Sequence, residues 1–245
     1  MGPKNRGYVK DKPKGLLRDY KLFAISCEGG KREPDYFHLC ELMSNRIKFD
    51  LIIDPEEEED IQTKSSPEWV LKRALNYIEE FGLNEDDSLW FVLDIDRWQK
   101  SHLQEIIKLC KGKKNWNIAL SNPCFEVWLY LHKKNDFSTY DITISLKQAV
   151  SDLEKGGYNP LSFISDIKIA MNNAKAIDKK SRTHYPEKFV SKVYNLFQEL
   201  FEFVSEDAFK IFIEKTIPEK IIAESVKKKS GRMAKEKSKR AGNKI

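Results

Sequence analysis

Four short and almost wholly apolar runs alternate with four amphipathic segments in the first half of the chain, and this alternation most constrains the fold. The apolar runs are typical of buried strands, and they lie at 21–27, 49–54, 89–93 and 116–120. The amphipathic segments have the spacing of helices, and they lie at 34–43, 66–82, 99–110 and 122–132. Strands and helices that alternate in this way predict a parallel sheet covered on both faces.

The pattern changes after residue 133, where three longer segments have helical spacing, at 144–155, 160–179 and 186–204. Residues 211–213 fit either a short strand or a helix. The sequence therefore predicts an α/β domain over 21–133, with a roughly four-stranded parallel sheet flanked by helices. A mainly helical extension over 134–225 is expected to pack on it.

Charge is distributed unevenly along the chain. The whole sequence carries a net charge of +5, whereas residues 226–245 carry +8 and residues 1–21 carry +5, so the remainder is acidic. We expect residues 1–20 to form a basic arm and 226–245 a disordered basic tail. Such ends either hold phosphates through a salt-sensitive attraction or are simply solvated.

Several protein classes are disfavoured by composition. No run approaches the roughly 18 apolar residues of a membrane-spanning helix, and the basic N-terminus lacks an apolar signal segment. The four cysteines form no C-x-x-C pair, so neither a zinc site nor a disulfide framework is indicated. We expect a cytoplasmic protein with reduced thiols.

Acidic residues follow two of the predicted strands. Glu28 comes directly after the first strand, and Asp94 and Asp96 come after the third. Parallel strands end at one edge of a sheet, and strands one and three are neighbours in the commonest small strand order. In an extended backbone, Asp94 and Asp96 point to the same side. Three clustered carboxylates need raised pKa values or a cation such as Mg²⁺. Turn-forming roles for these residues are the alternative.

The fourth predicted helix is apolar on nearly all sides, so we expect it to be buried. Asn122 is suited to cap it and Pro123 to occupy its first position. Glu126 lies among the apolar residues and needs a partner. It either assists the acidic centre or forms a salt bridge with Arg97 or a lysine. His132 is expected to be a satisfied edge histidine and not a ligand.

A glycine-rich loop and a basic stretch are weaker candidates for ligand contact. The loop at 29–31 lacks the spacing of a nucleoside-triphosphate loop. Its amides, with Lys31 and Arg32, are instead suited to contact a nucleic-acid phosphate. Glu33 is either a further ligand or an ordinary acid at a helix start. The basic stretch at 175–182 fits either a nucleic-acid path or an exposed helix face.

Three motifs together resemble the RloB family. They are SCEGGKREPDYF at 26–37, FVLDIDR at 91–97 and SNPCFEVWLYLH at 121–132. The likeness covers roughly residues 20–205 and weakens after 135. Members of this family are Toprim-like proteins found with restriction and abortive-infection loci, so the resemblance implies a Toprim-like fold.

The resemblance also implies roles for the acidic residues. Glu28 would be a general acid or base, or a metal ligand, and Asp94 and Asp96 would hold Mg²⁺ or Mn²⁺, with Glu126 beside them. The implied activity is that of a metal-dependent endonuclease in anti-phage defence, working beside an AAA-type ATPase. DNA and RNA, including tRNA, remain candidate substrates. The expected nucleic-acid contacts are Lys31, Arg32, Arg97 and Asn122.

Two other functions remain open. The main alternative is a non-catalytic module of the same fold that binds the ATPase partner or nucleic acid, with the carboxylates as a folding or metal site. Nucleotidyl transfer is the third possibility, but no template-binding domain is visible. The oligomeric state is not predicted.

Overall fold

The computed structural model describes residues 19–29, 31–53, 66–96 and 98–226, and it contains one five-stranded sheet. The strand order is β2-β1-β3-β4-β5. The first four strands are parallel, as the sequence predicts, and β5 runs antiparallel to β4. The strands are β1 (Lys21–Cys27), β2 (Ile47–Ile52), β3 (Ser88–Asp94), β4 (Trp116–Asn122) and β5 (Val190–Ser191).

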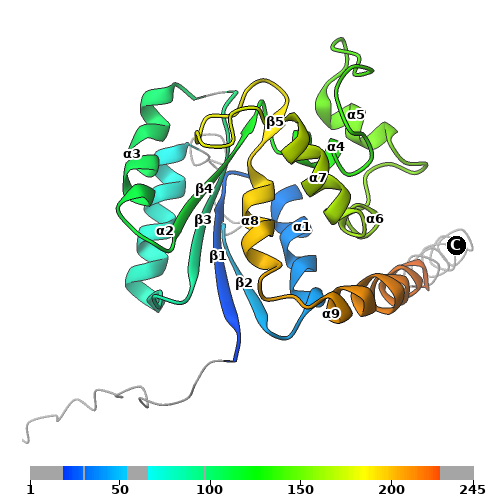
Figure 1. The fold of residues 1–245 in the computed structure, drawn as a ribbon, viewed down its shortest axis with the longest axis horizontal. Coiled ribbons are helices and arrows are strands. Elements are labelled where there is room, and N and C mark those ends of the chain that lie inside the picture. The colour runs from blue at the N-terminus through cyan, green and yellow to red at the C-terminus, as the bar shows by residue number, and fades with distance from the viewer. Residues whose placement is uncertain (1–18, 30, 54–65, 97, 227–245) are drawn as a thin grey trace, which may run out of the picture.

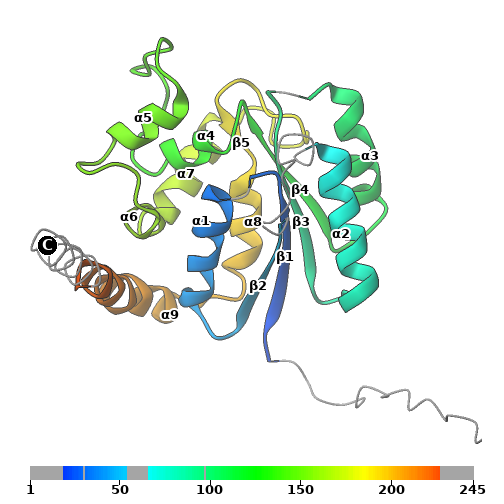
Figure 2. The same cartoon turned by 180° about the vertical axis from the view of Figure 1, so that it is seen from behind.

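Helices cover both faces of this sheet (Figures 1 and 2). One layer is formed by α2 and α3, and the opposite layer contains α1 and α8. The helices are α1 (Arg32–Cys40), α2 (Pro67–Phe81), α3 (Lys100–Lys111), α4 (Glu126–Tyr130), α5 (Leu146–Asp152), α6 (Pro160–Ile164), α7 (Ile167–Ile177), α8 (Val193–Leu200) and α9 (Glu206–Ile211). A 3₁₀ turn spans Glu41–Met43, and a π-helical turn spans Phe212–Thr216.

The apolar composition of the predicted strands is explained by the two helical layers, because these strands contribute side chains to the cores on both faces of the sheet. In β3, Phe91 packs with the α2 and α3 layer, whereas its neighbours Trp90 and Val92 pack with the opposite layer. Side chains of successive strand residues point to opposite faces. A strand buried on both faces therefore has no polar alternation, which is the pattern seen in the sequence.

The part of the chain after residue 133 differs from its predicted form. The predicted helix at 186–204 is wrong at its start, because Val190–Ser191 forms β5 before α8 begins. The predicted helix at 160–179 is two helices, α6 and α7. Residues 211–213 are helical. The strand β5 is too short to leave a periodic signal, and its pairing with β4 joins residues about 70 positions apart.

The start of the fourth helix also differs from the prediction. Asn122 is the last residue of β4 and Phe125 precedes the first residue of α4, so neither Asn122 nor Pro123 caps or begins this helix. The Asn122–Pro123 peptide bond is cis. The side-chain amide of Asn122 instead donates to the carbonyl of Pro186 at 3.1 Å. The helix α4 begins at Glu126. Its predicted burial is confirmed, since Trp128 and Leu129 have no exposed surface.

Other expectations have simple outcomes. All four cysteines are free thiols. Within the described residues, no helix is long and apolar enough to cross a membrane. Most of the basic arm and nearly all of the basic tail lie outside the described residues.

Candidate functional site

The first strand and its neighbour bring two predicted acidic residues to one edge of the sheet. Cys27 at the end of β1 pairs with Val92 of β3, and the backbone N–H of Glu28 donates to the Val92 carbonyl at 3.3 Å. Asp94 ends β3 two residues later. Glu28 and Asp94 therefore follow adjacent parallel strands at the carboxyl edge, where open α/β sheets place their ligand sites.

Two further carboxylates approach this edge from helices. Glu33 lies in the first turn of α1 and is only 9% exposed, and Glu126 begins α4 and is 4% exposed. Burial raises the pKa of Glu33 to about 7, and the charges of Glu126 and Glu28 add to the effect. The carboxylates that cluster at the sheet edge are therefore Glu28, Glu33, Asp94 and Glu126.

Asp94 is affected most strongly by this cluster. Burial raises its pKa well above the usual range, and repulsion from Glu33, Glu28, Glu126 and Asp96 raises it further, in that order of size. Close carboxylates cannot all be ionised without a compensating cation or proton. The carboxyl edge of the sheet therefore favours the binding of a cation or a proton.

Asp96 occupies a more peripheral place than the sequence predicts. The strand ends at Asp94, and residues 95–96 form a bend in which both backbone N–H groups donate to the Pro123 carbonyl, at 3.1 and 3.2 Å. The side chain of Asp96 is exposed. The expectation that an extended backbone points both aspartates to the same side therefore does not apply, because the extended segment stops too early.

Polar partners fix the positions of two of the carboxylates. The indole N–H of Trp98 donates to Oε2 of Glu28 at 3.1 Å. Nη1 of Arg32 donates to Oε1 of Glu126 at 3.0 Å, so Arg32 is a salt-bridge partner of Glu126.

The remaining candidate residues from the sequence are Lys31, Arg97 and His132. Lys31 is exposed beside the start of α1, and Arg97 lies outside the described residues. His132 is satisfied, as expected, but it lies in the core and not at an edge. Its ring contacts the Tyr36 hydroxyl at 2.8 Å and the Trp128 carbonyl at 2.9 Å, and burial lowers its pKa to about 3. We exclude His132 as a ligand at the carboxylate cluster because both ring nitrogens are engaged.

The donor set suits Mg²⁺ or Mn²⁺, which prefer carboxylate oxygens. In the described part of the chain, however, no three His, Cys, Asp or Glu side chains converge closely enough to hold an ion. The carboxylates share an edge and repel one another, so their chemistry fits a divalent cation while their spacing is wider than a coordination shell. Metal binding would have to draw them together.

Gly29 allows the cluster its close packing. A Cβ atom at this position would lie 2.2 Å from Oε2 of Glu33 and 2.4 Å from its Cδ, distances at which the carboxylate must move. The loop after β1 therefore needs a residue without a side chain for Glu33 to reach the cluster.

We expect Gly29→Ala to weaken Mn²⁺ binding by about tenfold or more, since displaced supporting groups typically cost a metal site 10–100-fold. Titration calorimetry with Mn²⁺ measures this loss. Gly112→Ala is the matched control, because a Cβ there first meets the Leu109 carbonyl at an ordinary 3.5 Å. Equal Mn²⁺ affinity in both variants and the unaltered protein would contradict the role of Gly29.

The sequence leaves one member of this site open and gives no sign of another. Glu33 is predicted to be either a further ligand or an ordinary acid at a helix start, and the structure places it beside Asp94, on which its charge has the largest effect among the carboxylates. Trp98 gives no signal of its own, because its contact with Glu28 depends on the path of the chain after β3.

Comparison with known proteins places the chain in a family without assigning an activity. No curated protein and no solved structure matches it. The model of the family described as RloB-like protein matches residues 23–200, which contain the sheet except for the first two residues of β1, the carboxylate cluster and α8. Because this match spans well over half of the sequence, the chain belongs to the RloB-like protein family.

Proposed function

We propose that this chain is a metal-dependent nuclease that cleaves phosphodiester bonds of DNA or RNA at the carboxylate cluster. The observation that carries the proposal is the convergence of Glu28, Glu33, Asp94 and Glu126 at one sheet edge, with strongly raised pKa values for Glu33 and Asp94. Two of these carboxylates, Glu33 and Asp94, are buried with raised pKa values, and such perturbed groups are concentrated at functional sites.

Each residue of the carboxylate cluster would have its own role. Asp94 and Glu28 would hold Mg²⁺ or Mn²⁺, with Asp96 at the exposed rim and Glu33 behind them. When bound, such an ion supplies positive charge to a phosphate and lowers the pKa of a bound water. Trp98 would keep Glu28 oriented toward the substrate, and Arg32 would hold Glu126 in place. Glu28 is the candidate general acid or base.

The setting of this activity is also a proposal, and it is supported by the motifs that resemble RloB proteins. We propose that the fold is Toprim-like, because Glu28 follows β1 and Asp94-x-Asp96 follows β3. Anti-phage defence and an AAA-type ATPase partner belong to the same proposal.

A second candidate function is a non-catalytic module that binds nucleic acid or the ATPase partner. The observation that favours it is the spacing of the carboxylates, which holds no group of three at coordination distance among the described residues. Under this alternative the cluster would be a folding or metal site. Substitution of Glu28 separates the two functions, because only a nuclease needs this side chain for cleavage.

The test is to sequence the nucleic-acid ends produced by the purified full chain on tRNA, single-stranded RNA and plasmid DNA. Reactions contain Mg²⁺, Mn²⁺ or EDTA. We expect new ends with metal that disappear in EDTA and with Glu28→Gln or Asp94→Asn. The same measurement in cells that express the chain, alone and together with the AAA-type ATPase proposed as its partner, tests whether this ATPase changes the cleavage. Identical ends from all three proteins would contradict the nuclease.

A further inference from the structure

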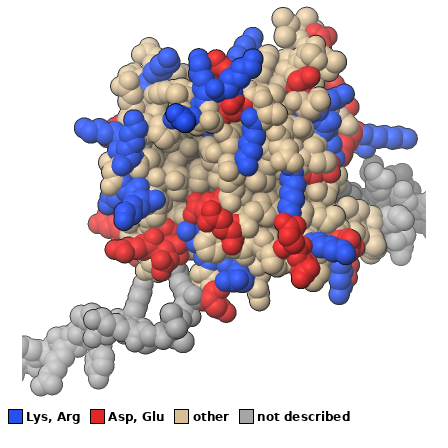
Figure 3. All heavy atoms as spheres, viewed as in Figure 1, with Lys and Arg blue, Asp and Glu red and all other residues tan. Residues whose placement is uncertain are grey.

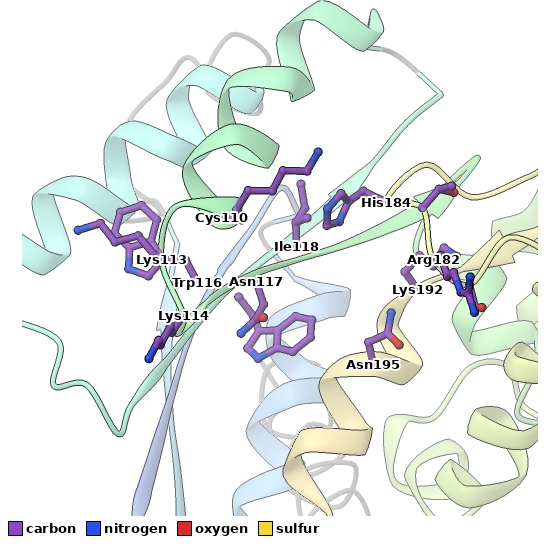
Figure 4. A pocket seen from close by; sticks show the side chains of 14 residues that line it. Cys110, Lys113, Lys114, Trp116, Asn117, Ile118, Arg182, His184, Lys192 and Asn195 are labelled. Carbon is purple, nitrogen blue, oxygen red and sulfur yellow. The ribbon is translucent and has the colours of Figure 1, made fainter.

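A basic hollow lies outside the carboxylate cluster, on the edge of the sheet formed by β4. It has a volume of about 330 Å³, and its lining comes from the C-terminal end of α3, from β4, from residues 181–184 and from the start of α8 (Figure 4). These segments are far apart in the sequence. The hollow is therefore a product of the fold and not of one charged run.

The lining is strongly cationic. It contains no Asp or Glu, and its cationic side chains are Lys111, Lys113, Lys114, Arg182 and Lys192. His184 also lines it, but burial lowers the pKa of this ring and favours its neutral form. Lys192 is only 2% exposed and is neutralised by Asp178. By contrast, the described part of the chain shows no ion pair for Lys111, Lys114 or Arg182, and all three side chains are exposed. Uncompensated positive charge around a concave surface attracts a polyanion.

The floor of the hollow adds groups that suit a nucleotide. The strand β5 pairs only with Ser121 and Asn122, so Asn117 and Ile118 of β4 face the hollow. Trp116 also lines it, with Nζ of Lys113 5.4 Å from the centre of its ring. In Figure 3, Lys and Arg side chains lie around a hollowed area in the upper half of this face. The site thus combines cations with amide and aromatic groups.

A second hollow adjoins the basic hollow and includes a residue that contacts the carboxylate cluster. Its volume is about 550 Å³, and Thr183 lines both hollows. It is also lined by Trp98, whose indole donates to Glu28. Lys100 and Tyr185 line it as well, with the lysine Nζ 5.6 Å from the centre of the tyrosine ring. The second hollow therefore shares one residue with the basic hollow and another with the surroundings of Glu28.

We propose that the basic hollow binds the phosphates of a single-stranded nucleic acid and that the strand continues past Tyr185 and Trp98 to the carboxylate cluster. This inference rests on the proposed nuclease function and deepens it by naming the strand state of the substrate. Positive grooves interleaved with aromatic side chains are the usual surface for unpaired strands, whose bases are free to stack. A duplex hides its bases and fits a concave hollow of this size poorly.

An acidic peptide added to the open edge of β4 is the competing occupant. The arrangement favours nucleic acid, because the second hollow includes Trp98, which contacts a cluster suited to phosphate chemistry. A peptide would also need no aromatic residues beside that cluster. The two occupants differ in salt response, since each phosphate contact of a single strand contributes about 0.7 to the slope of log affinity against log salt.

The test measures binding of fluorescent 15-nucleotide strands, RNA and DNA, to the full chain carrying Glu28→Gln in EDTA, so that cleavage plays no part. The groove variant combines Lys111→Gln, Lys114→Gln and Arg182→Gln. The matched control combines Arg46→Gln, Lys48→Gln and Lys72→Gln, which remove the same charges from exposed positions near the opposite edge strand β2. Retained thermal unfolding shows that each variant is folded.

We expect the groove variant to bind at least tenfold more weakly than its parent and its salt slope to fall by about 2, whereas the control should lose less than threefold. Equal losses in the two variants would overturn the site, and so would tighter binding of the duplex than of either single strand. Cleavage that persists in Glu28→Gln contradicts the proposed function alone, because the binding comparison does not depend on it.

Discussion

Glu33→Gln is expected to raise the metal-free stability of the protein at pH 8 by about 3 kcal/mol, which corresponds to roughly 6–12 °C in Tm for a chain of this size. The pKa of Glu33 is raised to about 7 by burial and by the neighbouring carboxylates. Below pH 4.5 the folded and unfolded proteins both carry the proton, so this residue costs nothing. Between pH 4.5 and 7 only the unfolded protein loses it, and stability falls as pH rises.

Glu33→Gln should also reduce the increase in Tm that Mn²⁺ produces. A cation bound at the cluster stabilises the folded protein in proportion to its affinity, and a neutral amide in place of the Glu33 carboxylate would no longer supply negative charge to it. The measurement is Tm at pH 4.5 and pH 8, in EDTA and in Mn²⁺, with exposed Glu80→Gln on α2 as the control. If the variant and the unaltered protein unfold at one temperature at pH 8 in EDTA, the cluster carries no such repulsion.

Comparison of the two proteins at each pH is needed because His132 acts in the opposite direction. Its pKa is lowered to about 3, so below pH 6.5 the unfolded protein takes up a proton that the buried ring of the folded protein does not bind. Stability therefore falls as pH drops from 6.5 toward 3. This contribution is common to both proteins and cancels in their difference, which isolates Glu33.

The sequence predicts the four parallel strands because this information is local, and it predicts that the first and third strands are neighbours. Runs such as KLFAISC mark strands buried on both faces, and turns after them place Glu28 and Asp94 at one edge. The strand neighbours follow from a general preference of small parallel sheets. These features do not depend on the details of side-chain packing, so they can be inferred without a structure.

Other features depend on contacts between distant residues and leave no local signal. The strand β5 exists only because Val190 and Ser191 pair with the end of β4. The exposure of Asp96 follows from the Pro123 carbonyl, which accepts two N–H groups and bends the chain after Asp94. The basic hollow joins α3 and β4 to residues 181–184. Composition along the chain cannot show which of many lysines will share one surface.

The buried pair of Asp178 and Lys192 shows how such a long-range contact supports the functional edge. Asp178 directly follows α7, and Lys192 lies between β5 and α8. Nζ of Lys192 donates to Oδ2 of Asp178 and, at 2.8 Å, to the carbonyl of Lys180. The Tyr194 hydroxyl donates to the same carboxylate at 2.7 Å. This network holds the segment that leads into the lining of both hollows.

We expect Asp178→Asn to lower the free energy of unfolding by about 3–5 kcal/mol, because it leaves the Lys192 ammonium buried without a counter-charge. Urea unfolding measures the loss. The control is Glu206→Gln, which breaks an ion pair with Lys168 whose side chains are 87% and 38% exposed and should cost about 1 kcal/mol or less. Combining Asp178→Leu with Lys192→Met removes both charges and should recover much of the stability. A loss no greater than in the control would show that the pair is not desolvated, and the segment before β5 would then need another anchor.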